Sequence, residues 1–228
     1  MPHVRFDWGS AGAARARGGA LVVVDVLSFT TAVSVAVERD VAVYPAARRD
    51  AHAAALGGEI GAVVAGRRGE PWSLSPAALL SAPARTRLVL PSPNGSAIAA
   101  AADGGVVAAC LRNAGAVATW LRAREHDPVT VVAAGERWPD GRLRPALEDL
   151  LGAGAVLAAL AADAESPQAA TARASYEATP SVPDAVRRCP SGVELVSAGF
   201  AQDVEVAVDL DAGDVVPVLV EGAFRRAL

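Results

Sequence analysis

The stretch ALVVVDVLSFTT, residues 20–31, decides the fold of this chain. Its first part, Ala20–Leu27, is apolar apart from Asp25, which predicts a short strand that is buried on both faces. A charge near the end of such a strand is costly unless it is paired or binds a cation. The hydroxyl-rich segment Ser28–Thr31 follows and opens a helix, whose N-terminus favours an anion. These features fit either a Mg²⁺–phosphate site or a plain turn in which Asp25 caps the next helix.

Short valine-rich segments alternate with helical segments along the whole chain. This alternation predicts an α/β layered fold with a largely buried β-sheet flanked by helices. The predicted strands are Ala20–Val26, Val41–Tyr44, Ile60–Ala65, Arg87–Leu90, Val106–Ala109, Val129–Ala134 and Val215–Val220. The predicted helices are Thr31–Arg39, Arg48–Leu56, Ser96–Ala102, Ala114–Arg124, Pro145–Ala162, Gln168–Glu177, Pro183–Arg188, Gly192–Ser197 and Ala201–Ala207. We expect a single domain of residues 1–228, although the polar turn Glu125–Pro128 could divide it into lobes of residues 1–126 and 127–228.

The composition excludes several classes of partner. Hydrophobic residues make up 52% of the 228 residues, yet no apolar stretch reaches the roughly 18–20 residues that cross a bilayer. The net charge is −4 and aromatic residues are 4%, so we expect no nucleic-acid partner, which would need a basic stripe or a stacking platform. Two cysteines, Cys110 and Cys189, favour free thiols in a cytoplasmic protein. The predicted ligand is therefore a small molecule.

The absence of lysine removes several mechanisms at once. A P-loop and a Schiff-base enzyme both need that amine. A cysteine phosphatase needs an arginine six positions after its cysteine, whereas Ala116 follows Cys110 and Leu195 follows Cys189 at that spacing. A haloacid-dehalogenase-type phosphatase needs a second aspartate where this chain has Leu27. Of the phosphatase mechanisms considered, the one that remains uses carboxylates together with a metal ion.

Polar residues follow several of the predicted strands, at the carboxyl ends where ligands collect in open α/β sheets. After Arg87–Leu90 comes a turn containing Asn94-Gly95-Ser96, whose amides could form a nest for an anion or an ordinary capped turn. After Val106–Ala109 come Arg112 and Asn113. Arg112 could clamp an anionic group through its planar fork, or it could be a surface arginine.

The last predicted strand before the long helix is followed by Glu136 and Arg142, and the helix itself carries Glu148 and Asp149. Adjacent helical residues point about 100° apart, so we expect only one of Glu148 and Asp149 to meet the site squarely. Glycines in this helix, at 152 and 154, predict close packing against a neighbouring element.

The ordered set of these motifs resembles the ComB-type 2-phosphosulfolactate phosphatases over nearly the whole chain. Members of that family carry Asp-Val-Leu-Arg-Ala-Thr-Thr after a strand, like residues 25–31 here, and Thr-Asn-Gly-Thr, like residues 93–96. Arg112-Asn113-Ala114, Ala134-Gly135-Glu136 and Leu147-Glu148-Asp149 are similar to later family segments. The chain departs from the pattern at Ser28, where the family has arginine, and at Arg67, where it has an acidic residue, which marks it as a divergent member.

The resemblance implies a cytoplasmic, Mg²⁺-dependent phosphatase that hydrolyses a small acidic phosphomonoester, 2-phosphosulfolactate or a relative. The implied catalytic residues are Asp25, Glu148 and Asp149, with Asp25 and Asp149 as metal ligands. The implied substrate-binding residues are Ser28, Thr30, Thr31, Asn94, Gly95, Ser96, Arg112, Asn113, Glu136 and Arg142. Asp25 could act as nucleophile or only as a ligand. A paralogue that binds a phospho-ligand without catalysis is the alternative, and the alanine-rich helices leave room for a homodimer.

Overall fold

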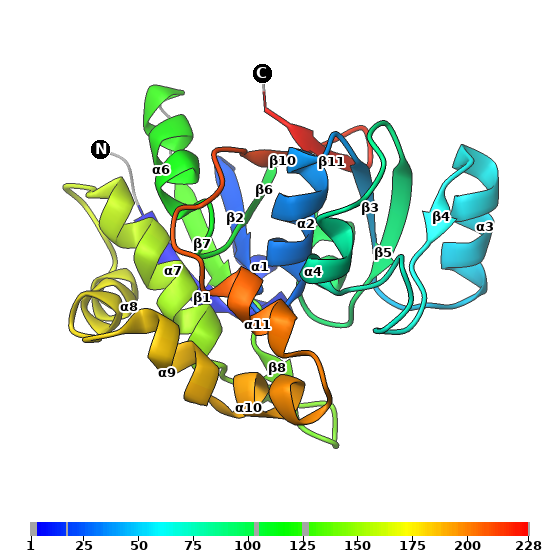
Figure 1. The fold of residues 1–228 in the computed structure, drawn as a ribbon. Coiled ribbons are helices and arrows are strands. Elements are labelled where there is room, and N and C mark those ends of the chain that lie inside the picture. The colour runs from blue at the N-terminus through cyan, green and yellow to red at the C-terminus, as the bar shows by residue number, and fades with distance from the viewer. Residues whose placement is uncertain (1–3, 17, 103–104, 125–127, 228) are drawn as a thin grey trace.

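Nine strands form one mixed sheet flanked by helices in the computed structural model of the protein, which describes residues 4–16, 18–102, 105–124 and 128–227 (Figure 1). The predicted α/β fold class is confirmed. Within the described ranges, no helix combines the length and the apolar character needed to cross a membrane. The predicted lobe boundary falls at residues 125–127, which lie outside those ranges.

The sheet consists of two parallel blocks and an antiparallel hairpin between them. The strand order is β1-β7-β2-β6-β10-β11-β3-β5-β4. The first block contains β1 (Val4–Trp8), β7 (Val129–Ala133), β2 (Ala20–Val24) and β6 (Val106–Ala109), all parallel. The second contains β3 (Ala42–Ala46), β5 (Arg87–Pro91) and β4 (Val63–Val64), also parallel. Because β7 lies between β1 and β2, residues on both sides of the predicted lobe boundary share one sheet.

The hairpin of β10 (Pro217–Val220) and β11 (Ala223–Arg226) joins the two blocks. It pairs with β6 only at Val218–Val107 and with β3 only at Phe224–Val43, both antiparallel. These three antiparallel steps set the two blocks in opposite directions. The right-handed twist between neighbouring strands rotates the second block relative to the first. The turns after β2 and β5 still meet, because the amide of Gly95 contacts Asp25.

Strand β2 is buried on both faces, as its sequence predicts. Leu21 and Val23 belong to the apolar cluster on one face, under α2 (Phe29–Glu38) and α5 (Gly95–Ala100). Val22 and Val24 belong to the cluster on the other face, under α6 (Ala114–Ala123) and α7 (Leu147–Leu160). The residues after β2 are thereby fixed from both sides.

The remaining elements surround this core. They are α1 (Gly9–Ala13), α3 (Ala51–Ile60), α4 (Pro76–Leu79), α8 (Pro167–Glu177), α9 (Val182–Arg188), α10 (Pro190–Ser197), α11 (Ala201–Ala207) and the small hairpin β8 (Glu136–Arg137) and β9 (Leu143–Arg144). The close packing predicted for the glycines of α7 is confirmed. A Cβ on Gly152 would lie 2.6 Å from Val26 Cγ2, and one on Gly154 would lie 2.5 Å from the carbonyl oxygen of Ala172.

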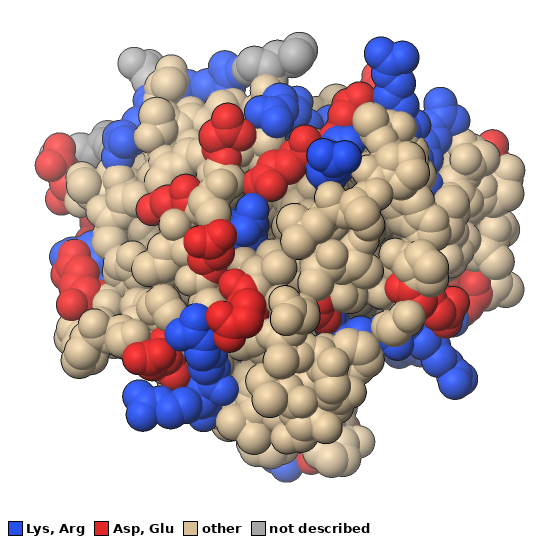
Figure 2. Space-filling model, in the orientation of Figure 1, with Lys and Arg blue, Asp and Glu red and all other residues tan. Residues whose placement is uncertain are grey.

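One predicted strand is largely wrong. Residues 60–62 of the predicted strand Ile60–Ala65 are not extended, because α3 runs through Ile60 and ends at Gly61 in the left-handed conformation. The carboxylate of Asp50 caps this helix through the amides of His52 and Ala53, so α3 starts and ends later than predicted. Both cysteines are free and buried, as expected. On the face seen in Figure 2, the described acidic and basic side chains are interspersed and form no continuous basic stripe.

Candidate functional site

Asp25 lies in the turn between β2 and α2, with both carboxylate oxygens held by backbone amides. Its Oδ1 accepts from the amide of Phe29 at 3.1 Å, and its Oδ2 accepts from the amide of Gly95 at 2.7 Å. The hydroxyls of Thr30 and Thr31 brace the same turn, because they donate to the carbonyls of Asp25 and Val26 at 2.8 Å each. The aspartate is 3% exposed, so its orientation is fixed.

The turn after β5 reaches Asp25 and also orients a second carboxylate. Gly95 supplies the amide that contacts Asp25, and Asn94 donates from Nδ2 to Glu136 Oε2 at 2.9 Å. Ser96 is fully buried, donates to the carbonyl of Leu90 and accepts from the amide of Ala46. The structure therefore brings Asp25, Asn94, Gly95 and Glu136 together, whereas the Ser96 hydroxyl stabilises the turn.

The two acidic residues at the start of α7 are both buried behind Asp25. Asp149 accepts from the amide of Val26 at 2.7 Å and from that of Gly135 at 2.8 Å, so it links the ends of β2 and β7. Glu148 accepts from the thiol of Cys189 at 3.1 Å. Each carboxylate thus has a structural contact of its own.

A pocket of about 430 Å³ opens over these turns. It is lined by Asp25, Leu27, Ser28, Arg68, Leu74, Ser92, Pro93, Asn94, Glu136, Ser191, Glu194, Leu195, Ala198 and Phe200. Among these lining residues, three are acidic and Arg68 alone is basic. Glu148 and Asp149 are absent from the lining, so Asp25 and Glu136 are the carboxylates of the predicted set that face the pocket.

Three carboxyl groups of this region have a raised pKa. Burial raises the pKa of Asp25 to about 6, although the amides of Gly95 and Phe29 act in the opposite direction. Burial also raises the pKa of Glu136 to about 7, and the negative charge of Asp25 adds to that increase. Burial raises the pKa of Asp149 as well, with further contributions from Asp25 and Glu148. The region therefore carries more negative charge than its arginines balance, and a cation or protons would relieve the excess.

We expect this excess charge to make the metal-free protein less stable as the pH rises. An acid whose pKa is raised on folding keeps its proton in the native state while the unfolded chain loses it, so the free energy of unfolding falls between about pH 4.5 and pH 7. Glu136→Gln should remove about 1–2 kcal/mol of this fall, or roughly 2–8 °C in Tm between pH 5 and pH 8.

Thermal unfolding in chelator at both pH values measures this effect. Glu59→Gln, on the exposed side of α3, is the matched control and should keep the slope of the unsubstituted protein. An equal slope in all three proteins would contradict the assignment of the raised pKa to Glu136.

The donor set fits Mg²⁺ better than it fits a metal enclosed by protein ligands. Within the described residues, no three His, Cys, Asp or Glu side chains are grouped closely enough to hold a metal ion. Mg²⁺ usually binds one or two carboxylates and completes its shell with water and substrate phosphate. Asp25 and Glu136 both line the pocket, so two carboxylates of the kind that Mg²⁺ uses are present there.

Three predicted substrate-binding residues lie away from the pocket. Arg112 pairs with Glu38 at 3.2 Å and with Asp209 at 3.7 Å. Glu38 ends α2, so the ten residues of that helix, or about 15 Å at 1.5 Å per residue, separate this pair from Asp25. The other two are Asn113, which is fully buried and donates to the carbonyls of Ala108 and Val215, and Arg142, whose largely exposed side chain pairs with Asp140.

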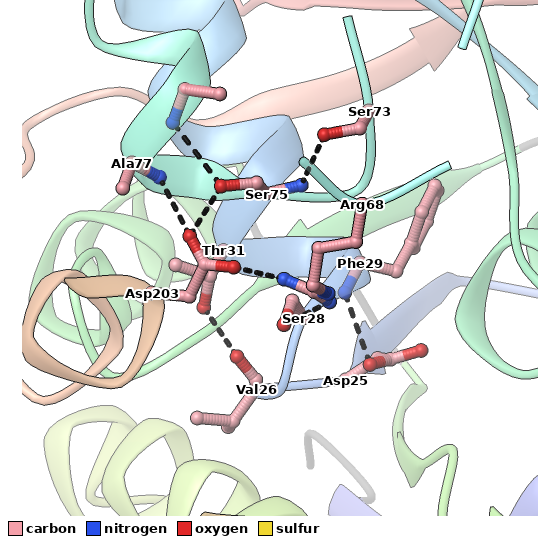
Figure 3. Close-up of polar contacts among 11 residues, drawn as sticks. Asp25, Val26, Ser28, Phe29, Thr31, Arg68, Ser73, Ser75, Ala77 and Asp203 are labelled. Atoms are coloured by element: carbon pink, nitrogen blue, oxygen red, sulfur yellow. Dashed lines mark hydrogen bonds and ion pairs between the residues drawn. The ribbon is translucent and has the colours of Figure 1, made fainter. Parts of the chain in front are cut away.

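The structure adds residues that the sequence did not reveal. Arg68 reaches the pocket from the loop between β4 and α4, and its Nη2 donates to the Ser28 hydroxyl at 3.1 Å. Its Nη1 pairs with the carboxylate of Asp203, on α11 (Figure 3). The sequence shows an arginine pair at 67–68, but 135 residues separate Arg68 from Asp203, so no local pattern could link them.

Comparison with known proteins finds similarity to one family of phosphatases. The family model described as 2-phosphosulpholactate phosphatase matches residues 11–222. A 2-phosphosulfolactate phosphatase of Methanothermobacter thermautotrophicus is 32% identical over 213 residues, which cover 91% of this chain and 89% of that protein. A probable 2-phosphosulfolactate phosphatase of Thermotoga petrophila is 32% identical over 120 residues, which cover 52% of this chain and 50% of that protein.

Proposed function

This chain belongs to the 2-phosphosulpholactate phosphatase family, and we propose on that basis that it is a Mg²⁺-dependent phosphatase of small acidic phosphomonoesters. The proposed substrate is 2-phosphosulfolactate or a close chemical relative. The observation that carries the proposal is the pocket in which the fixed carboxylate of Asp25 lies beside Glu136, with Arg68 on the same lining. Acidic groups to hold a metal and a basic group to meet an anion are what this reaction requires.

Asp25 would be the residue nearest the chemistry. The amides of Phe29 and Gly95 fix both of its oxygens, so the carboxylate cannot rotate away from the pocket. Asn94 holds one oxygen of Glu136 through its side-chain amide. Both as a nucleophile and as a metal ligand, Asp25 would gain from this orientation, because little reorganisation is left for the moment of reaction.

Asp25 and Glu136 would hold the Mg²⁺ ion. When bound, the ion would neutralise phosphoryl oxygens and lower the pKa of a bound water. Asp149, predicted from the sequence as a metal ligand, would act behind Asp25, since it is absent from the pocket lining and its oxygens link the ends of β2 and β7. The proposal therefore replaces Asp149 by Glu136 as the second ligand.

The predicted phosphate cradle is engaged within the protein, which bears equally on catalysis and on the alternative, a protein that binds a phospho-ligand without catalysis. The backbone amides of Phe29 and Gly95, which could have cradled a phosphate, are both engaged by Asp25. The Thr30 and Thr31 hydroxyls donate to backbone carbonyls. A phosphate would then depend on other donors of the pocket.

Phosphate release separates the two functions. We expect release from 2-phosphosulfolactate or 2-phospholactate with Mg²⁺, and a fall to background in chelator, because the pocket has one arginine against three acids. A panel that adds glycerol 2-phosphate and p-nitrophenyl phosphate would rank the substrates. Release that persists in chelator would contradict the metal dependence. No release, with ligand binding detected as a rise in Tm, would favour the binding protein.

A further inference from the structure

The guanidinium of Arg68 is held at the pocket by three contacts. Nη1 pairs with Asp203 Oδ2, and Nη2 donates to Ser28 Oγ at 3.1 Å. The guanidinium carbon also lies 5.5 Å from the centre of the Phe200 ring, within the range of a cation–π contact. Figure 3 shows Arg68 between Asp203 and Ser28, with Asp25 close by. A long, flexible side chain is thus confined to one place.

Groups other than Arg68 also hold the Asp203 side chain in place. Its side chain is 1% exposed. Its Oδ1 accepts from the hydroxyl of Ser75 and from the amide of Ala77 at 3.2 Å, and its Oδ2 faces Arg68. Ser75 caps α4 through the amide of Ala78 at 3.2 Å. A buried carboxylate with both oxygens engaged provides a rigid support for an arginine.

Arg68 has further N–H donors with which it can bind a ligand. Arginine has five N–H donors, and the hydrogen bonds that the structure describes for Arg68 go to Asp203 and Ser28. The side chain is 17% exposed and lines the pocket. A guanidinium in this position can present two parallel N–H groups to two oxygens of a phosphoryl group.

Because the pocket lining is mostly acidic, Arg68 is important for the binding of an anion there. Asp25, Glu136 and Glu194 are the acids of the lining, and Arg68 is the basic residue that opposes them among the lining residues described. Arg68 is close enough to Asp25 for its charge to lower the pKa of that carboxyl. An anion that binds beside Asp25 is therefore attracted by the positive charge of Arg68.

We propose that Arg68 binds the phosphoryl group of the substrate and that Asp203 is the positioning residue that holds its guanidinium. This inference rests on the proposed function for the identity of the anion. It adds a specificity determinant from two segments, the β4–α4 loop and α11, that contain none of the predicted site residues.

Inorganic phosphate, measured by calorimetry with Mg²⁺ present, is the probe. We expect Arg68→Gln to raise its dissociation constant about tenfold to a hundredfold, the usual effect of losing charge-assisted hydrogen bonds. Arg68→Lys keeps the charge but not the planar fork, and we expect a smaller loss. Arg67→Gln is the matched control, because it removes the same charge from the adjacent, exposed residue outside the pocket lining and should leave phosphate affinity unchanged.

Asp203→Asn tests the positioning role. We expect phosphate affinity to fall, although less than for Arg68→Gln. In the double variant, Asp203→Asn should add nothing to the loss caused by Arg68→Gln, because its effect passes through the arginine. A purely structural role would lower Tm in both backgrounds and leave phosphate affinity unchanged. If Asp203→Asn does not fold, Ser75→Ala removes one of the groups that hold Asp203 and should show the same non-additivity.

The outcomes distinguish this inference from the proposed function. Arg68-dependent phosphate binding in a protein that releases no phosphate would support the inference and overturn the phosphatase. An active enzyme whose phosphate affinity and KM are unchanged by Arg68→Gln would overturn the inference alone. An unsubstituted protein that does not bind inorganic phosphate at millimolar concentration would also overturn it.

Discussion

Asp25→Asn is expected to lower kcat by at least about a thousandfold while the protein stays folded. Asparagine has nearly the same shape, but it cannot carry the charge that a metal ligand or a nucleophile needs. One amide, of Phe29 or Gly95, would lose its acceptor, at a cost of about 1–3 kcal/mol. Removal of a buried charge, whose pKa is raised to about 6, offsets part of that cost at neutral pH.

The measurement is phosphate release at saturating substrate, together with thermal unfolding of the same preparation. Asp184→Asn, an exposed acid on α9, is the control for the loss of one negative charge, and we expect it to retain turnover. Activity within tenfold of the unsubstituted enzyme would show that Asp25 is neither the nucleophile nor an essential metal ligand. A variant that is both inactive and unfolded would leave Asp25 as a structural residue of the β2–α2 turn.

Gly95→Ala is expected to reduce turnover about a hundredfold, the second largest effect. A Cβ at this position would lie 2.7 Å from Asp25 Oδ2 and 2.8 Å from Phe29 Cδ1, closer than atoms can approach. Phe29 is fully buried, so the clash must displace Asp25, the turn after β5, or both. Such overpacking also costs about 1–3 kcal/mol of stability.

Kinetics and thermal unfolding of Gly95→Ala separate the two effects. Gly58→Ala is the matched control, because Gly58 is an exposed glycine of α3 with open space around its Cβ position. We expect that control to keep full activity and to gain about 0.5–1 kcal/mol from the better helix propensity of alanine. If Gly95→Ala kept normal kcat, the contact between residue 95 and Asp25 would have no role in catalysis.

The sequence predicted three strands of the first block, β2, β6 and β7, well because they are buried on both faces. β2 and β6 read as continuous apolar segments, and Val106–Ala109 is confirmed to the residue. β1 was missed because the predicted strands were continuous apolar segments. Residues 4–8 instead alternate between apolar and polar side chains, as a half-buried edge strand does. The short α4 was missed too, since four residues carry too little periodicity to stand out.

The candidate site was only partly predictable, for a related reason. Sequence position shows which residues follow a strand, so Asp25, Asn94, Gly95 and Glu136 could be grouped before the structure was known. It does not show where a long side chain finds its partner. Arg112 follows a strand like the others, yet its guanidinium pairs with Glu38 at the far end of α2 and with Asp209 after α11.

The hairpin β10–β11 also fixes the order in which the sheet can be completed. Its residues, 217–226, are translated after both parallel blocks, yet they form the two strands at the seam between them. Until they emerge from the ribosome, β6 and β3 present open edges, which are the places where β-sheet proteins aggregate. The hairpin is therefore the element that joins the two blocks into a single sheet, and it follows both of them in the chain.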